Sequence, residues 1–150
     1  MSLSLLVVDD QSSLRRLIEV IAGEDPRYGV VVSAAGVAEA VRLAGQHQPD
    51  AVLLDAGLGH EDGLASIGEL RKAAPRIVVV VFSSAPFADH DSARRAGADL
   101  FVPKGTDPDL VLDLMAQQVE ARRARGRHLD LDGDLDSDLD KAPYTISPQP

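Results

Sequence analysis

The sequence predicts a single α/β domain, built as a five-stranded, doubly wound sandwich around a parallel sheet. Two observations support this fold class. Short apolar runs alternate five times with longer amphipathic segments, and the short runs are continuously apolar, as in strands buried on both faces. Because each crossover between parallel strands brings a helix onto the sheet, five such units predict one parallel sheet covered by helices. Ligands of these sheets bind at the carboxyl ends of the strands.

Each unit carries its own signals. Runs of aliphatic and β-branched residues predict five strands, at residues 5–8, 30–32, 51–54, 77–82 and 100–102. Apolar residues at helical spacing predict five helices, at residues 12–23, 37–47, 64–74, 89–96 and 108–125. Ser12 or Ser13 is the expected N-cap of the first helix, and Pro75 closes the third. Gly97 ends the fourth as a left-handed cap, and Asp107-Pro108 opens the fifth.

Composition excludes several classes of protein. The chain has no cysteine, which removes disulfides, thiolate nucleophiles and zinc-thiolate sites. No apolar run approaches the ~20 residues that span a bilayer, so we expect a cytoplasmic protein without membrane contact. The net charge of −9 argues against direct binding to nucleic acid, which needs clustered Lys and Arg.

The end of the chain differs from the rest. We expect the domain to occupy residues 1–125 and an acidic tail to occupy residues 126–150. The tail has Asp at every even position from 130 to 140 and contains three prolines. Low hydrophobicity with dense like charge predicts a segment that is disordered when free or ordered only by a partner.

Charged and polar residues follow the predicted strands. Asp9 and Asp10 follow the first strand and Asp55 follows the third; Ser84 comes after the fourth and Lys104 after the fifth. These strand ends share one edge of the sheet. Three carboxylates at one edge repel one another unless a divalent cation lies between them, and oxygen ligands suit Mg²⁺. The sequence therefore predicts a Mg²⁺ site there.

A carboxylate beside a cation and a lysine can act as a nucleophile towards a phosphoryl group. Phosphoryl transfer depends mainly on positioning and on neutralising charge on the equatorial oxygens. The Ser84 hydroxyl and the Lys104 ammonium can each meet one of those oxygens. Asp55 is the expected nucleophile of this set.

The ordered set of Asp9-Asp10, Asp55, Ser84-Ala85 and Lys104 resembles the receiver domains of bacterial response regulators. The resemblance covers roughly residues 5–121. It implies a flavodoxin-like fold and a phosphorylation switch in two-component signalling, which catalyses its own phosphoryl transfer and is not an enzyme with turnover.

The resemblance also implies a role for each acidic residue. Asp55 would accept the phosphoryl group from a phosphohistidine of a sensor histidine kinase or of a phosphotransfer protein. Asp10 would bind Mg²⁺ directly and Asp9 through water, and the backbone carbonyl of Gly57 would complete the protein ligands together with Asp55.

The remaining residues would transmit the change. Ser84 would swing towards the phosphoryl group, Phe101 would turn inward into the space that Ser84 leaves, and Lys104 would pair with the phosphate. The surface formed by the fourth helix, the fifth strand and the fifth helix would then change shape. That surface would bind a downstream effector or output domain, or a second copy of the chain as a homodimer.

Two glycines depart from the family's pattern, because Gly59 and Gly105 stand where the family usually has proline. We expect the loop Gly57–Gly59 to be looser than usual, since glycine enlarges the accessible backbone space. A non-proline cis peptide bond costs about 3 kcal/mol, so we expect the bond between Lys104 and Gly105 to be trans.

Two other functions remain open at this point. A pseudo-receiver would use the same fold as an interaction or dimerisation module without phosphorylation, and the two glycines leave room for it. A phosphatase of a related α/β fold would carry Asp-x-Asp after the first strand, where this chain has adjacent aspartates. A dinucleotide-binding module is disfavoured, because no glycine-rich loop follows the first strand.

Overall fold

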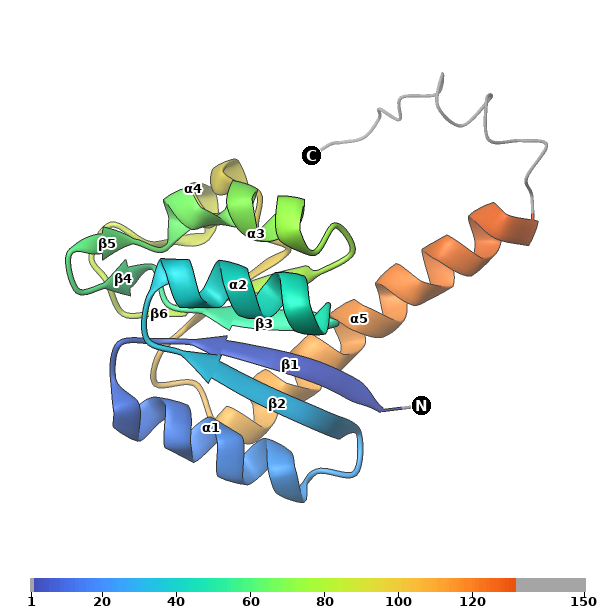
Figure 1. Cartoon of the computed structure of the whole chain (residues 1–150), viewed down its shortest axis with the longest axis horizontal. Helices are drawn as coiled ribbons and strands as arrows, with labels where there is room; N and C mark the ends of the chain where they lie inside the picture. The colour runs from blue at the N-terminus through green and yellow to red at the C-terminus, as the bar shows by residue number, and fades with distance from the viewer. Residues whose placement is uncertain (1, 132–150) are drawn as a thin grey trace. The chain divides into compact units, whose positions relative to one another are not determined.

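The computed structural model describes the backbone of residues 2–131 and the side chains of residues 2–127. Its main sheet has five parallel strands in the order β2-β1-β3-β6-β7 (Figure 1). The strands are β1 (Leu3–Val8), β2 (Tyr28–Ala34), β3 (Ala51–Leu54), β6 (Val78–Ser83) and β7 (Leu100–Pro103). The strand order reverses at β1, which lies between β2 and β3. The predicted doubly wound fold is confirmed.

Five α-helices follow the strands, with a short 3₁₀ turn, η1 (Leu64–Ser66), before the third. The helices are α1 (Ser12–Glu24), α2 (Val37–His47), α3 (Ile67–Ala73), α4 (His90–Ala96) and α5 (Pro108–Leu131). The left-handed cap at Gly97 is confirmed, with φ +104°. The predicted serine N-cap of α1 is wrong: Gln11 is the N-cap, its side chain makes no capping bond, and both serines lie in the first turn.

Helix α5 is longer than predicted. It continues past residue 125 through Gly126 to Leu131, although glycine costs a helix about 1 kcal/mol relative to alanine. The first six residues of the predicted tail are therefore helical, and residues 132–150 lie outside the described part of the chain. One compact unit ends at Val119, and a second begins at Glu120. Among the described residues, no helix combines the length and hydrophobicity needed to cross a membrane.

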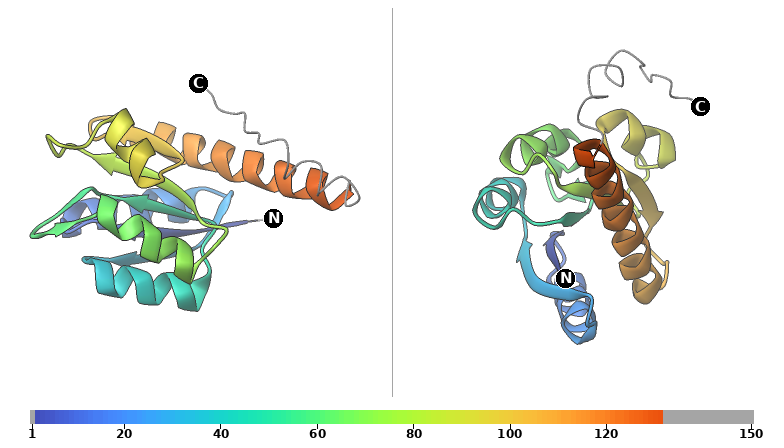
Figure 2. Two further views of the ribbon diagram at one scale, coloured as in Figure 1. Left: turned by 90° about the horizontal axis from the view of Figure 1, so that it is seen from above. Right: turned by 90° about the vertical axis from the view of Figure 1, so that its right-hand side faces the viewer.

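Both faces of the sheet are buried. Helix α1 and the part of α5 up to Val119 pack on one face, and α2, α3 and α4 pack on the other (Figures 1 and 2). Within β1, Leu5 and Val7 face α1 and α5, whereas Leu6 and Val8 face α2 and its neighbours. Burial on both faces explains why the strands are continuously apolar in sequence.

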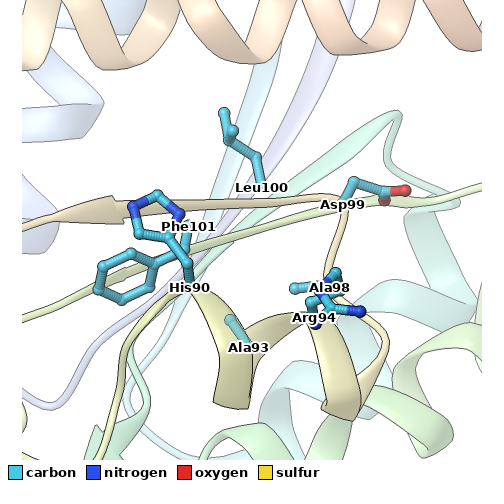
Figure 3. A pocket seen from close by; sticks show the side chains of 7 residues that line it. All are labelled: His90, Ala93, Arg94, Ala98, Asp99, Leu100 and Phe101. Carbon is cyan, nitrogen blue, oxygen red and sulfur yellow. The ribbon is translucent and has the colours of Figure 1, made fainter. Parts of the chain in front are cut away.

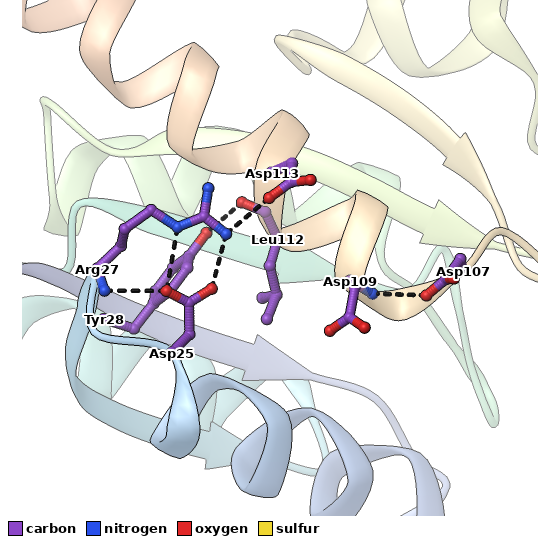
Figure 4. Close-up of polar contacts among 7 residues, drawn as sticks. All are labelled: Asp25, Arg27, Tyr28, Asp107, Asp109, Leu112 and Asp113. Carbon is purple, nitrogen blue, oxygen red and sulfur yellow. Dashed lines mark hydrogen bonds and ion pairs between the residues drawn. The ribbon is translucent and has the colours of Figure 1, made fainter.

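A polar cluster ties the start of β2 to α5 (Figure 4). The Arg27 guanidinium binds the carboxylates of Asp25 and Asp113, each at 2.7 Å. The buried Tyr28 hydroxyl donates a hydrogen bond of 2.6 Å to the carbonyl of Leu112. The contacts of Arg27 with Asp113 and of Tyr28 with Leu112 join segments more than eighty residues apart, so they fix the first part of α5 against the sheet.

The loop after β3 contains a short hairpin. Strands β4 (Gly57–Leu58) and β5 (Glu61–Asp62) form an antiparallel hairpin, with Leu58 opposite Glu61. Gly59, the first turn residue, has φ +64°, a conformation that glycine adopts readily. Glycine therefore closes a two-residue turn here, and the expectation that this loop is looser than usual stays a prediction.

Candidate functional site

The acidic residues meet because β1 and β3 are adjacent and in register. Val8 pairs with Leu54, so Asp9 and Asp55 leave the sheet side by side. The backbone N–H of Asp55 also donates to the carbonyl of Val8 at 2.9 Å. One oxygen from each of Asp9, Asp10 and Asp55 lies within 4.8 Å of the others. The predicted convergence of three carboxylates is confirmed.

Asp9 is the most enclosed of the three, with 2% of its surface exposed. Its Oδ1 accepts from the backbone N–H of Gln11 at 2.8 Å, and its Oδ2 lies 2.8 Å from the Lys104 ammonium. Burial raises the pKa of the Asp9 carboxyl, and the nearby Asp55 acts in the same direction, while the hydrogen bonds from Lys104 and Gln11 only partly oppose this rise. The ionised form of Asp9 is thus disfavoured by its burial.

Lys104 supplies a positive charge between the two buried carboxylates. Its Nζ lies 2.9 Å from Oδ2 of Asp55, in addition to its contact with Asp9. Burial works to lower the pKa of this ammonium, but the bonds to both carboxylates outweigh it and raise the pKa, so Lys104 stays charged. The described chain has no cis peptide bond, which confirms the expected trans bond before Gly105.

The hydroxyl beside Asp55 comes from Ser83, not from Ser84. The Ser83 hydroxyl is buried and donates to Oδ1 of Asp55 at 2.8 Å, whereas Ser84 is exposed. The predicted strand ended at Phe82, but β6 includes Ser83 as its last residue. Since side chains alternate along a strand, an error of one residue selects a side chain that points elsewhere.

Asp55 is held from several sides. Besides Ser83 and Lys104, the backbone N–H of Gly57 donates to its Oδ1 at 3.0 Å. Gly63 packs directly on the Asp55 carbonyl, where an added Cβ would overlap that oxygen. The Gly63 N–H also donates to the carbonyl of Ala56 at 2.7 Å. Only glycine fits this return of the chain past the acidic residue.

The predicted aromatic, Phe101, lies on β7 and faces α4. Its ring contacts the His90 ring edge-on, with centroids 5.1 Å apart (Figure 3). Both residues line a cavity of about 160 Å³ between α4 and β7, together with Arg94 and Leu100. Phe101 therefore lies beside α4, on the surface expected to bind partners.

The donor set fits a hard divalent cation. The three converging groups are all carboxylates, which Mg²⁺ prefers, and Asp10 is exposed, so the cluster can be reached from solvent. A bound cation would also relieve the repulsion among the three carboxylates. The residues present are thus compatible with a metal site.

Sequence reasoning missed two contacts around this site. Arg15 on α1 donates to the backbone carbonyl of Asp9 at 2.7 Å. Glu61 on the hairpin accepts from the backbone N–H of Val37 at 3.0 Å. Neither contact leaves a local pattern, because each joins a side chain to backbone in a different segment.

The family model of the response regulator receiver domain matches residues 5–116. The chain belongs to this family. The match includes both aspartates after β1, Asp55 with the loop that follows it, and Lys104. This receiver domain carries the family's five-stranded fold and an acidic pocket closed by a lysine.

Several known proteins are similar to this receiver domain. A protein-glutamate methylesterase/protein-glutamine glutaminase of Aliivibrio fischeri is 36% identical over 110 residues, which cover 69% of this chain and 28% of that protein. The first curated relatives are matched over only 27% to 32% of their length. The activities in their names belong to those whole proteins.

Solved structures agree with the fold. NtrX from Brucella abortus superposes with a TM-score of 0.77 at 28% identity, covering 87% of this chain and 30% of that one. A two-component response regulator of the LuxR family from Aurantimonas sp. SI85-9A1 gives a TM-score of 0.72 at 25% identity, covering 81% and 88%. The receiver fold thus recurs in proteins of different total length.

Proposed function

We propose that this receiver domain accepts a phosphoryl group on Asp55 and acts as a signalling switch. The observation that carries the proposal is the set of contacts on one carboxylate: Ser83 and the Gly57 amide on Oδ1, and Lys104 on Oδ2. Two neutral donors and an ammonium fix the orientation of this nucleophile. The same donors would lie close to the oxygens of an arriving phosphoryl group.

In the transfer, an Asp55 carboxylate oxygen attacks the phosphorus of a phosphohistidine on a sensor kinase or phosphotransfer protein. A P–O bond forms, the P–N bond breaks, and its electron pair returns to the imidazole nitrogen of the donor. Lys104 would pair with one phosphoryl oxygen and Ser83 would donate to another. Ser83 thereby takes the role that the sequence assigned to Ser84.

Mg²⁺ would be held by Asp10 and Asp55, by Asp9 through water, and by the backbone carbonyl of Gly57. When bound, the ion neutralises negative charge on the phosphoryl oxygens. The chain's own contribution is to keep these carboxylates together and to keep Lys104 charged between two of them.

The output would be a change of the surface formed by α4, β7 and α5. Phe101 and His90 lie on this surface and contact each other, so a movement of the Phe101 ring would alter α4 as well. A downstream effector, an output domain or a second copy of the chain would bind the altered surface. We propose that this surface does not bind nucleic acid directly. Three aspartates, Asp107, Asp109 and Asp113, add negative charge in and just before the first turns of α5, and this charge repels phosphates.

The test is to incubate the full chain with Mg²⁺ and acetyl phosphate and to locate any phosphoryl group by mass spectrometry. We expect one phosphoryl group on Asp55, none in Asp55→Asn, and normal uptake in the control Asp91→Asn, which removes an exposed carboxylate on α4. Absence of uptake from several donors would favour the pseudo-receiver. Repeated turnover of unrelated phosphoesters would favour a phosphatase.

A further inference from the structure

We propose that Glu61 is a positioning residue that fastens the β4–β5 hairpin to α2 and thereby shapes the acidic pocket. The inference rests on the proposed function, since the pocket is taken to hold a divalent cation beside Asp55. The contact joins the hairpin to α2, two segments that no sequence pattern indicates as neighbours.

The first step is the contact with α2. Gly36 is the N-cap of this helix and provides no side-chain capping bond. Oε1 of Glu61 instead accepts from the Val37 backbone N–H at 3.0 Å, from a position 24 residues away. A carboxylate also suits the positive end of the helix dipole. A Cβ at Gly36 would come within 3.0 Å of the same oxygen, so glycine leaves room for this contact.

The second step is the attachment of the hairpin. Glu61 lies directly opposite Leu58 in the ladder, and the Leu58 side chain is buried among the residues beneath α2 and α3. Leu58 thus holds one strand of the hairpin by apolar contact, and Glu61 holds the other by a hydrogen bond. The described part of the chain gives the hairpin these two anchors on the α2 side of the sheet.

The third step links the hairpin to the carboxylates. At its base, the Gly57 N–H binds Oδ1 of Asp55. At its tip, Oδ2 of Asp10 is the nearest atom to the Cβ position of Gly59, at 3.8 Å. The hairpin therefore borders both Asp55 and Asp10, and a shift of the hairpin changes the space between them.

These contacts predict that losing the Glu61 bond weakens cation binding without unfolding the domain. In Glu61→Ala, we expect the Mg²⁺ affinity to fall about fivefold and the Val37 amide to exchange about fivefold faster, the size expected for one lost cap. Glu61→Gln keeps an amide oxygen that can accept the same bond, so it should retain most of both properties. Glu69→Ala removes an equally exposed charge on α3 and serves as the matched control.

The measurements are Mg²⁺ titration by calorimetry and amide hydrogen exchange by NMR on the full, unphosphorylated chain. Weaker Mg²⁺ binding in Glu61→Ala with rescue by Glu61→Gln supports the inference. Faster Val37 exchange with unchanged Mg²⁺ affinity would show that Glu61 only caps α2, and an equal loss in Glu69→Ala would show a general charge effect; either result overturns it.

The same experiment separates this inference from the proposed function. If the unmodified chain binds Mg²⁺ but accepts no phosphoryl group, the proposed switch fails while the comparison of Glu61 variants still decides the role of the hairpin. If the unmodified chain does not bind Mg²⁺ at millimolar concentration, the positioning role of Glu61 is overturned as well.

Discussion

The Ser83 hydroxyl donates a 2.8 Å hydrogen bond to Oδ1 of Asp55, while the next residue, Ser84, is exposed. The two serines therefore form a matched pair for testing which hydroxyl acts at the site. Both are small, adjacent and chemically identical, so a difference between their alanine variants reports position alone.

We expect Ser83→Ala to slow phosphoryl uptake from acetyl phosphate by about tenfold or more, because a hydrogen bond to a charged group is lost from the transition state. Ser84→Ala should leave the rate within about twofold of the unmodified chain, since surface substitutions have small effects. Time-resolved intact-mass measurements give both rates. A slower rate in Ser84→Ala with a normal rate in Ser83→Ala would show that Ser84, the serine predicted from the sequence, acts at the site.

Lys104→Met should destabilise the fold in buffer that contains EDTA. The substitution leaves the buried carboxylates of Asp9 and Asp55 facing each other without a cation, and we expect a loss of about 2 kcal/mol in the free energy of unfolding at pH 7. Mg²⁺ should recover part of this loss by binding the folded state. Urea unfolding followed by far-UV circular dichroism measures both values, with the exposed Lys72→Met as the control.

Asp25→Asn tests the cluster that fixes α5. The hydrogen bond from Arg27 lowers the pKa of the Asp25 carboxyl below its ordinary value of 3.8, so the ionised form stabilises the folded state. This contribution is present above pH 3.8 and is lost as the pH falls through the lowered pKa. We expect Asp25→Asn to be less stable by up to about 1 kcal/mol at pH 7, with the difference shrinking as the pH falls below 3.8 through the lowered pKa. A difference that does not shrink as the pH falls below 3.8 would contradict the electrostatic origin.

Gly63→Ala should be severely destabilising. The new Cβ would overlap the Asp55 carbonyl, so the loop must move away from the acidic site, and we expect a loss of about 3 kcal/mol or more. Gly68→Ala on α3 has open space around the added Cβ and should be neutral or stabilising by up to about 1 kcal/mol. Thermal unfolding of the two variants provides the comparison, and similar stability of both would refute the steric argument.

The fold and the acidic pair follow from sequence because they depend on strong local signals. A continuous apolar run that ends at Asp9 places this residue at a strand end, and the run before Asp55 does the same. Adjacent parallel strands then bring the two residues together. The pairing of β1 with β3 is a property of the topology and needs no side-chain detail.

The rest of the site depends on details that local patterns do not carry. Choosing between Ser83 and Ser84 requires the last residue of β6 to be known without error, and strand ends are the least certain part of such a reading. The bond from Glu61 to Val37 joins a hairpin to a helix, and nothing near either residue indicates the other. The extension of α5 through Gly126 likewise runs against the residue's own preference.

Lys104 gives the acidic pocket a built-in positive charge. Its ammonium serves as a tethered counter-ion for two acidic groups and so compensates part of the negative charge of the pocket. When a divalent ion binds, the carboxylates exchange part of their pairing with Lys104 for pairing with the ion, because part of their charge is already compensated. Occupancy of the pocket should consequently follow the concentration of free magnesium and fall at high ionic strength.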